Sequence, residues 1–187
     1  MSSAANLTDH FLIAMPGLMD PNFYHTVTYI CEHGEDGAMG IVVNRPMNIQ
    51  LGEILAQMQI PCSAPDPMQQ PIYIGGPVAM ERGFVLHATG PQWASTLEIT
   101  PQISITTSQD ILEAIAADQG PKEQLIALGY AGWGRGQLER ELSENAWLSG
   151  PADRDIIFRL PVDRRWHAAA RLLGVDLDIL SNEAGHA

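Results

Sequence analysis

The chain has 187 residues, 45% of them hydrophobic, and its 22 acidic and 10 basic side chains give a formal charge of −12. These values fit one folded domain covering residues 1–187 and exclude wholesale disorder. The scarcity of Lys and Arg argues against nucleic acid and anionic membranes as partners, because basic side chains carry both kinds of binding. The first apolar run, Phe11 to Met15, is too short for a signal peptide or a membrane span, so we expect a cytoplasmic protein.

The first part of the chain predicts a hairpin, a helix and a long loop. Thr26 to Cys31 alternates like a strand, and 38–43 is a second, buried strand after a run of turn residues, so the pair is predicted to be antiparallel. Apolar residues within 51–58 recur at helical spacing. Four prolines within 61–71 predict an extended surface loop, because proline offers no backbone donor to helix or sheet.

The rest of the chain alternates between strand and helix signals. Strands are predicted for six short apolar or alternating segments: 72–74, 83–89, 95–99, 103–106, 125–128 and 156–158. Helices are predicted after the capping-box pattern of Thr107 and Asp110, over 137–142, and from Pro161 to Gly174. This interleaving predicts a single-domain α/β sandwich, with a mixed, largely antiparallel sheet covered by helices.

Several short motifs occur in collinear order over almost the whole chain. They include Phe11-Leu12-Ile13-Ala14-Met15-Pro16, Gly40-Ile41-Val42-Val43-Asn44-Arg45-Pro46, Gly75-Gly76-Pro77-Val78, Arg82-Gly83-Phe84-Val85-Leu86-His87 and Leu128-Gly129-Tyr130-Ala131-Gly132-Trp133. Together they resemble the YqgE/AlgH family of bacterial proteins. The resemblance implies an α/β sandwich, a bacterial cytosolic setting and a regulatory role of unknown mechanism in alginate and virulence-related production. It implies no known reaction, and no cofactor is expected.

Two arginines stand out as candidate ligand anchors. Arg45 and Arg82 are the only basic side chains in the first hundred residues. Arg45 lies in Asn44-Arg45-Pro46, which ends a predicted strand. The turn Gly75-Gly76-Pro77 ends another predicted strand. Arginines on such loops can clamp a carboxylate or a phosphate in bidentate fashion. The alternative is that each pairs with one of the acidic side chains in the same part of the chain.

A third candidate is the glycine-rich run Gly132-Trp133-Gly134, between a predicted strand and a predicted helix. Bare backbone N–H groups at such a place can cradle phosphate, yet neither a dinucleotide fingerprint nor a P-loop is present. The alternative is a tight turn with Trp133 on a loop, partly exposed and available as a contact residue. Ser108 is a further candidate, because it opens a predicted helix and a hydrolase would need it beside His87 and Asp110. Helix capping explains Ser108 equally well.

Metal and redox chemistry receive less support. Cys31 and His33 share strand parity, but a metal needs a third ligand and no CxxC or HExxH motif occurs, so no metal site is predicted. Cys31 and Cys62 are too few for a disulfide framework and are expected to pack as reduced thiols. The sequence leaves open whether either has a redox role.

The residues together with the resemblance favour a non-enzymatic regulatory or adaptor protein that binds a protein or a small ligand at a shallow apolar cleft. We place the cleft among Asn44-Arg45-Pro46, Gly75-Gly76-Pro77 and Gly132-Trp133-Gly134. Two alternatives remain: a hydrolase-like enzyme acting on a phosphorylated or carboxylated metabolite, and a direct transcriptional regulator. A direct transcriptional regulator would need one basic face built from the eight Lys and Arg after residue 100.

Overall fold

A computed structural model describes residues 5–184 of the protein, and in this part of the chain ten strands form one curled sheet. The strands are β1 (His10–Ala14), β2 (Val27–Gly34), β3 (Gly37–Val42), β4 (Pro46–Gln50), β5 (Pro71–Ile74), β6 (Val78–Ala88), β7 (Thr96–Glu98), β8 (Ile103–Thr106), β9 (Gln124–Trp133) and β10 (Trp147–Pro151). The helices are α1 (Leu51–Gln57), α2 (Pro65–Met68), α3 (Asp110–Ala116), α4 (Gln137–Ser143), α5 (Arg154–Phe158), the 3₁₀ turn Val162–Arg164, α6 (Arg165–Arg171) and α7 (Leu177–Ala184). The predicted α/β class is confirmed.

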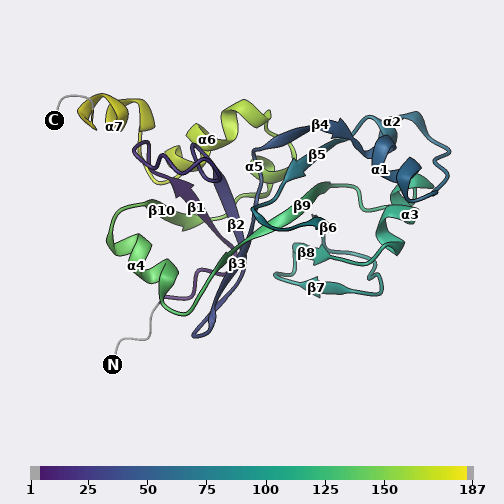
Figure 1. Cartoon of the computed structure of the whole chain (residues 1–187), viewed down its shortest axis with the longest axis horizontal. Helices are drawn as coiled ribbons and strands as arrows, with labels where there is room; N and C mark the ends of the chain where they lie inside the picture. Colours follow the sequence, from purple (N-terminus) through teal and green to yellow (C-terminus); the bar gives the residue numbers. More distant parts are fainter. Residues whose placement is uncertain (1–4, 185–187) are drawn as a thin grey trace.

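Strand β9 connects the two halves of the sheet. The strand order is β10-β1-β2-β3-β9-β6-β8-β7, and the pair β4-β5 joins this path at β9. Figure 1 shows β9 crossing the molecule diagonally, with β1, β2, β3 and β10 on one side and β4 to β8 on the other. The β5–β9 pairing is parallel and the other strand pairs are antiparallel, which confirms the predicted mixed, largely antiparallel sheet.

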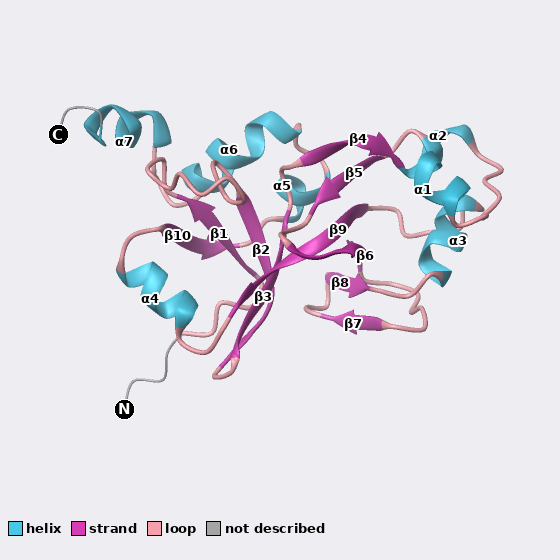
Figure 2. Ribbon diagram, viewed as in Figure 1, coloured by secondary structure: helices cyan, strands magenta, loops and turns pink. Residues whose placement is uncertain are grey.

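Three apolar clusters hold the helices against the sheet. The largest lies under α5, α6 and the start of α7, and includes Phe11, Tyr29, Phe84 and Trp166. A second packs α1 and α3 on β5, β6 and β9, and a third packs α4 on the opposite face of β1, β2 and β9. Helices therefore lie at both ends of the sheet and on both of its faces (Figure 2). The largest cluster continues past the helices that cover it, and a pocket opens at that uncovered end.

Most predicted elements are confirmed, and three local predictions are wrong. The loop 61–71 contains the short helix α2, which begins with Pro65 at a position where its missing N–H is no loss. The segment 156–158 belongs to helix α5, because the Asp153 carboxylate accepts hydrogen bonds from two backbone N–H groups of the first turn. The capping box predicted for α3 is not formed. The N-cap residue is Gln109, and the Asp110 carboxylate instead accepts from the backbone N–H of Ala94 at 2.8 Å.

The glycine-rich run after residue 128 is also more regular than the sequence suggests. Strand β9 continues to Trp133, because β3 pairs with it from Ala131 onward. Only the last part of the run forms the turn into α4, where Gly136 has a left-handed φ of 73°. In the described part of the chain no helix is both long and apolar enough to span a bilayer.

Candidate functional site

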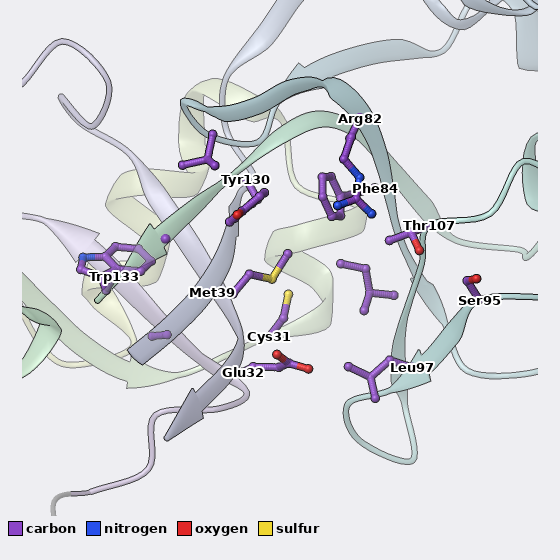
Figure 3. Close-up of a pocket in the computed structure, with 14 residues that line it drawn as sticks. Cys31, Glu32, Met39, Arg82, Phe84, Ser95, Leu97, Thr107, Tyr130 and Trp133 are labelled. Carbon is purple, nitrogen blue, oxygen red and sulfur yellow. The ribbon is translucent and has the colours of Figure 1, made fainter. Parts of the chain in front are cut away.

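A pocket of about 630 Å³ opens where the largest apolar cluster extends beyond its helices. Strands β2 and β3 form one wall, β6 and β9 form a second, and β7 and β8 form a third (Figure 3). Apolar side chains line the interior, among them Met39, Phe84, Ile105 and Tyr130. We call this site the Arg82 pocket, after the arginine at its rim.

Strand alternation explains which side chains of β6 reach the pocket. Successive side chains of a strand point to opposite faces. Arg82 and Phe84 therefore face the Arg82 pocket, whereas Glu81, Gly83 and Val85 line a second cavity of about 450 Å³ on the other face, beside α1 and α3. The same alternation separates Arg82 from Glu81, its acidic neighbour in sequence.

A bulge in β6 presents Arg82. Between Val78 and Gly83 the chain advances five residues while its partner β9 advances two, and Ala79 has a left-handed φ of 48°. Such irregularities re-aim side chains and are frequent beside functional sites. The Arg82 guanidinium carbon lies 5.5 Å from the centre of the Phe84 ring. Among the described side chains, which end at Ser181, Arg82 has no ion-pair partner, so the structure does not show the predicted alternative of a pairing with an acid.

A second bulge brings Glu32 to the opposite side of the pocket. The β2–β3 register shifts between Ile30 and Glu32, which places both Cys31 and Glu32 on the pocket wall. The Glu32 side chain is exposed and forms no ion pair with a described residue. Cys31 is 2% exposed, and burial raises the pKa of its thiol above the ordinary value. Cys31 is therefore a protonated part of the pocket floor at neutral pH.

Three of the predicted site residues line the pocket: Arg82, Gly132 and Trp133. Trp133 differs from the prediction, because it is 5% exposed and lies within β9 instead of on a loop. Its indole N–H donates to the Glu141 carboxylate at 3.1 Å, and Trp147 donates to the same carboxylate at 2.9 Å. The expected exposed contact residue is thus buried, and α4 holds its indole in the third cluster, on the opposite face of the sheet from the largest cluster. Gly134, the third residue of the run, lies outside the pocket lining.

The other predicted residues of the cleft lie around the middle of β9. Gly75 and Gly76 are buried against it, and a Cβ on either would overlap a backbone carbonyl of Gly129 or Tyr130. Gly129 in turn faces the Gly76 carbonyl. We call Gly75, Gly76 and Gly129 the glycine seam, because these three residues let two backbone segments touch. Pro77 follows the seam and is exposed.

Asn44 and Arg45 also serve contacts within the protein. The Asn44 side chain accepts from the Val27 N–H at 2.8 Å and donates to the His25 carbonyl at 2.9 Å. Arg45 donates to the Tyr24 carbonyl at 3.3 Å, and Pro46 begins β4. The Arg82 pocket is lined by none of the residues Asn44, Arg45, Pro46, Gly75, Gly76 and Pro77. The structure therefore divides the predicted cleft into two separate regions.

Ser108 and His87 do not meet as a hydrolase would require. The Ser108 hydroxyl donates to the Asp110 carboxylate and accepts from the Ser95 N–H. The hydrogen bond from Ser108 lowers the pKa of Asp110. His87 is fully buried, and its Nε2 lies 2.7 Å from the Thr106 hydroxyl. Desolvation lowers the pKa of His87, so a neutral ring with Nδ1–H donating to the Ala88 carbonyl fits both contacts. Both side chains hold loops and strands together.

The residues considered for a metal or a phosphate have other partners. His33 lies in β2, not in a turn; its Nδ1 accepts from the Leu7 N–H and its Nε2 lies 2.7 Å from the Glu139 carboxylate. In the described residues no three His, Cys, Asp or Glu side chains gather as a metal site would require. In the glycine-rich turn, the Gly134 N–H donates to the Gln137 side chain, so this donor of the imagined phosphate cradle is already bonded.

Sequence reasoning missed the partners of Arg82 in the pocket. Glu32, Leu97 and Tyr130 come from three different strands and Thr107 directly follows a fourth, and the pairing of these strands is set by the topology of the sheet. The sequence does indicate one partner of Arg82, because alternation along β6 puts Arg82 and Phe84 on one face of the strand. Which strands face them depends on contacts between segments far apart in the chain.

Comparison with known proteins now places this arrangement in a family. The AlgH-like family model matches residues 11–178. The chain belongs to the AlgH-like family. A UPF0301 protein of Thioalkalivibrio sulfidiphilus is 56% identical to this AlgH-like chain over the whole of both sequences, and one of Methylococcus capsulatus is 52% identical over 99% of the chain and 98% of the relative. The resemblance seen in the sequence motifs is confirmed.

Solved structures support the same assignment. The AlgH protein of Pseudomonas aeruginosa has a TM-score of 0.80 to this AlgH-like chain at 54% identity, covering 100% of this chain and 99% of that one. A protein from Corynebacterium diphtheriae shares the fold, with a TM-score of 0.76 at 19% identity, over 97% and 94% of the two chains. The fold is thus kept where most of the sequence differs.

Proposed function

We propose that this AlgH-like protein is a regulatory or adaptor protein of the bacterial cytoplasm that binds a ligand in the Arg82 pocket. One observation carries the proposal: a pocket of about 630 Å³ with apolar side chains along its walls and an exposed arginine at its rim, with which no described acid forms an ion pair. Its volume is in the range of pockets that accept small organic molecules. A pocket with apolar walls and a few polar groups can equally receive one side chain of a partner protein.

The chemistry of the pocket favours binding over catalysis. Its thiol, Cys31, has a pKa raised by burial, which disfavours the reactive thiolate. Two hydroxyl side chains at the mouth, Ser95 and Thr107, form no side-chain hydrogen bond to a histidine or a carboxylate of the described residues. A nucleophile that lacks a base within hydrogen-bond reach is weakly activated. A hydrolase is therefore the weaker alternative.

Direct binding to DNA also receives little support from the basic residues. Three of the eight Lys and Arg after residue 100 are engaged within the protein. Arg154 and Arg159 pair with Glu123, and Arg165 is 5% exposed and donates to two backbone carbonyls. Because DNA binding needs basic side chains gathered on one face, their engagement argues against that alternative.

Blocking the pocket tests the proposal. In the double variant Leu97→Trp/Thr107→Trp, two exposed side chains at the pocket are replaced by indoles. Its matched control is Leu172→Trp/Ile179→Trp, because these two side chains are also exposed, at 53% and 57%, and lie near α6 and α7. Both double variants introduce two indoles at exposed positions, and only the first pair lies at the pocket.

Each protein is incubated with a small-molecule extract and, separately, with a protein lysate of the native bacterium. Retained molecules are identified by native mass spectrometry, and the folding of each variant is checked by circular dichroism. We expect the wild type and the control to retain the same ligand or partner, and the pocket variant to lose it. If the pocket variant retains everything that the wild type retains, the proposed binding site is wrong.

A further inference from the structure

The charges around the Arg82 pocket bear on what kind of ligand it accepts. This step rests on the proposed function, because it assumes that the pocket binds a ligand. Arg82 is the one Lys or Arg among the residues that line it. Its guanidinium lies over the Phe84 ring. A cation–π contact uses none of the guanidinium N–H groups as conventional hydrogen-bond donors to an oxygen, so they are available for a carboxylate, which they can match in bidentate geometry.

Hydroxyl groups lie on the same side of the pocket as Arg82. Figure 3 shows Thr107 and Ser95 along the wall that runs from Arg82 toward Leu97. Both residues are exposed at the pocket, so a bound anion could accept from a hydroxyl as well as from the guanidinium. The hydrogen-bond donors of the guanidinium and of the two hydroxyl groups therefore lie on the same side of the pocket.

The walls beyond this corner are apolar. Met39, Phe84, Leu97 and Ile105 line the interior, and the sulfur of Met39 points toward the pocket from β3 (Figure 3). Methionine adapts its shape to different apolar groups. A ligand that fills this space therefore carries an apolar body of several carbon atoms attached to its anionic group.

Glu32 restricts the far end of such a ligand. It lies across the pocket from Arg82, on the β2 bulge (Figure 3), and no described basic side chain pairs with it. A second anionic group near Glu32 would be repelled, and the formal charge of −12 adds to that repulsion. Polyanions such as nucleoside diphosphates and dicarboxylates are therefore disfavoured.

We infer that the ligand of the Arg82 pocket is an amphipathic monocarboxylate, with its carboxylate on Arg82 and an uncharged apolar body extending toward Glu32. The cavity beside α1 and α3 offers no comparable pattern, because among its lining residues Glu81 is the one charged side chain. The Arg82 pocket thus presents a cation, which the lining of the other cavity lacks.

Matched probes test the inference by isothermal titration calorimetry. The probes are 6-phenylhexanoate, its uncharged amide 6-phenylhexanamide, and inorganic phosphate. We expect the wild type to bind the carboxylate about tenfold more tightly than the amide, since a hydrogen bond to a charged group contributes at least that much. Phosphate without an apolar body should bind more weakly than the carboxylate.

Arg82→Gln is the decisive variant, and Arg45→Gln is its control. Arg82→Gln should remove the tenfold preference for the carboxylate and leave the affinity for the amide unchanged. Arg82→Lys, which keeps the charge and loses the bidentate fork, should retain part of the preference. Arg45→Gln should bind both probes like the wild type, because Arg45 does not line the pocket.

Glu32→Gln tests the far end of the ligand. This variant should bind the dicarboxylate suberate more tightly than the wild type does, by about fivefold, while its affinity for 6-phenylhexanoate changes less. An equal gain for both probes would show that Glu32 acts through the net charge of the protein and not at the far end of the ligand, which contradicts the proposed orientation.

The outcomes separate this inference from the proposed function. If the amide binds as well as the carboxylate and Leu97→Trp/Thr107→Trp blocks both, the pocket is a binding site but the monocarboxylate class is wrong. If the carboxylate preference survives in Arg82→Gln, Arg82 is not the anchor. If the wild type binds neither 6-phenylhexanoate nor its amide, the inference is also overturned, whereas the extract experiment still decides the proposed function.

Discussion

Strand β9 borders two regions that look alike in the sequence and differ in the structure. At the glycine seam, backbone meets backbone, and the neighbouring Asn44 side chain bonds to two backbone groups. At the Arg82 pocket, Arg82 and Glu32 have no ionic partner among the described residues, and open volume lies between them. Both regions combine glycine with arginine. Motifs of glycine and arginine can therefore serve packing alone, whereas a charge without an ionic partner beside a cavity indicates a ligand site.

The largest expected effect tests the packing role of the seam. In Gly76→Ala, the new Cβ would overlap the Tyr130 backbone, so we expect a loss of more than about 3 kcal/mol in the free energy of unfolding. Gly83→Ala is the control, because nothing lies within 4 Å of a Cβ there and the effect should be far smaller. Urea denaturation monitored by circular dichroism measures both. Equal stabilities would show that the seam tolerates side chains and is not a close contact.

The next effect tests whether Asn44 is a structural residue. Asn44→Ala would leave the buried N–H of Val27 and the carbonyl of His25 without this partner, at a cost of about 2 kcal/mol. Asn22→Ala at an exposed position should change the free energy of unfolding by less than about 0.5 kcal/mol. If the Asn44→Ala protein is as stable as the wild type but no longer binds a ligand, Asn44 is a ligand-binding residue and not a structural one.

A pH dependence tests whether the pocket floor is closed. Burial raises the pKa of the Cys31 thiol above its ordinary value of 9.0. Above pH 9 the unfolded chain releases the thiol proton and the folded protein keeps it, so stability falls as pH rises. The contribution of the Cys31 thiol to the free energy of unfolding is complete below pH 9. Above pH 9 this contribution declines by up to about 1.4 kcal/mol per pH unit.

Urea denaturation at pH 8, 9 and 10 measures this decline. In Cys31→Ala the slope above pH 9 should be shallower than in the wild type, although Tyr29, whose pKa is also raised by burial, adds a decline near pH 10. Cys62→Ala is the control, because Cys62 is partly exposed in the loop before α2 and its removal should keep the wild-type slope. A wild-type slope in Cys31→Ala would mean that water reaches the thiol.

The smallest effect separates folding from binding at the two arginines. Arg45→Gln and Arg82→Gln should each change the free energy of unfolding by less than about 0.5 kcal/mol, because neither makes an ion pair with a described residue. Thermal denaturation of the two variants beside the wild type gives this comparison. A large loss of stability in Arg82→Gln would mean that its stacking on Phe84 holds the pocket together, and the binding measurements would then report folding.

Local signals in the sequence predicted most of the elements. The alternation of Thr26 to Cys31, the helical spacing within 51–58 and the glycine that ends the helix after Pro161 depend on neighbours in the chain, and all correspond to elements of the structure. The strand predicted for 156–158 is wrong, because three apolar residues fit a strand or a helix equally well. Its helix depends on Asp153, which caps it.

The candidate site was predictable only in part. Arg82 was identified by the scarcity of basic residues, and Trp133 by its size and flanking glycines, and both line the pocket. The expected exposure of Trp133 was wrong, because α4 folds back and places Glu141 against its indole N–H. Ser108 and His87 each have a local partner in the structure, so a list of reactive residue types could not show whether they meet.

By itself, the sequence determined the α/β class, the family and the isolation of Arg82 as a cation, because these depend on composition, periodicity and motifs along one chain. Only the tertiary structure decided that Arg82 faces Glu32 across a pocket while Arg45 does not line it. The reason is that pocket walls come from segments far apart in sequence, whose register along β2, β6 and β9 is set by hydrogen-bonded pairing and by two bulges.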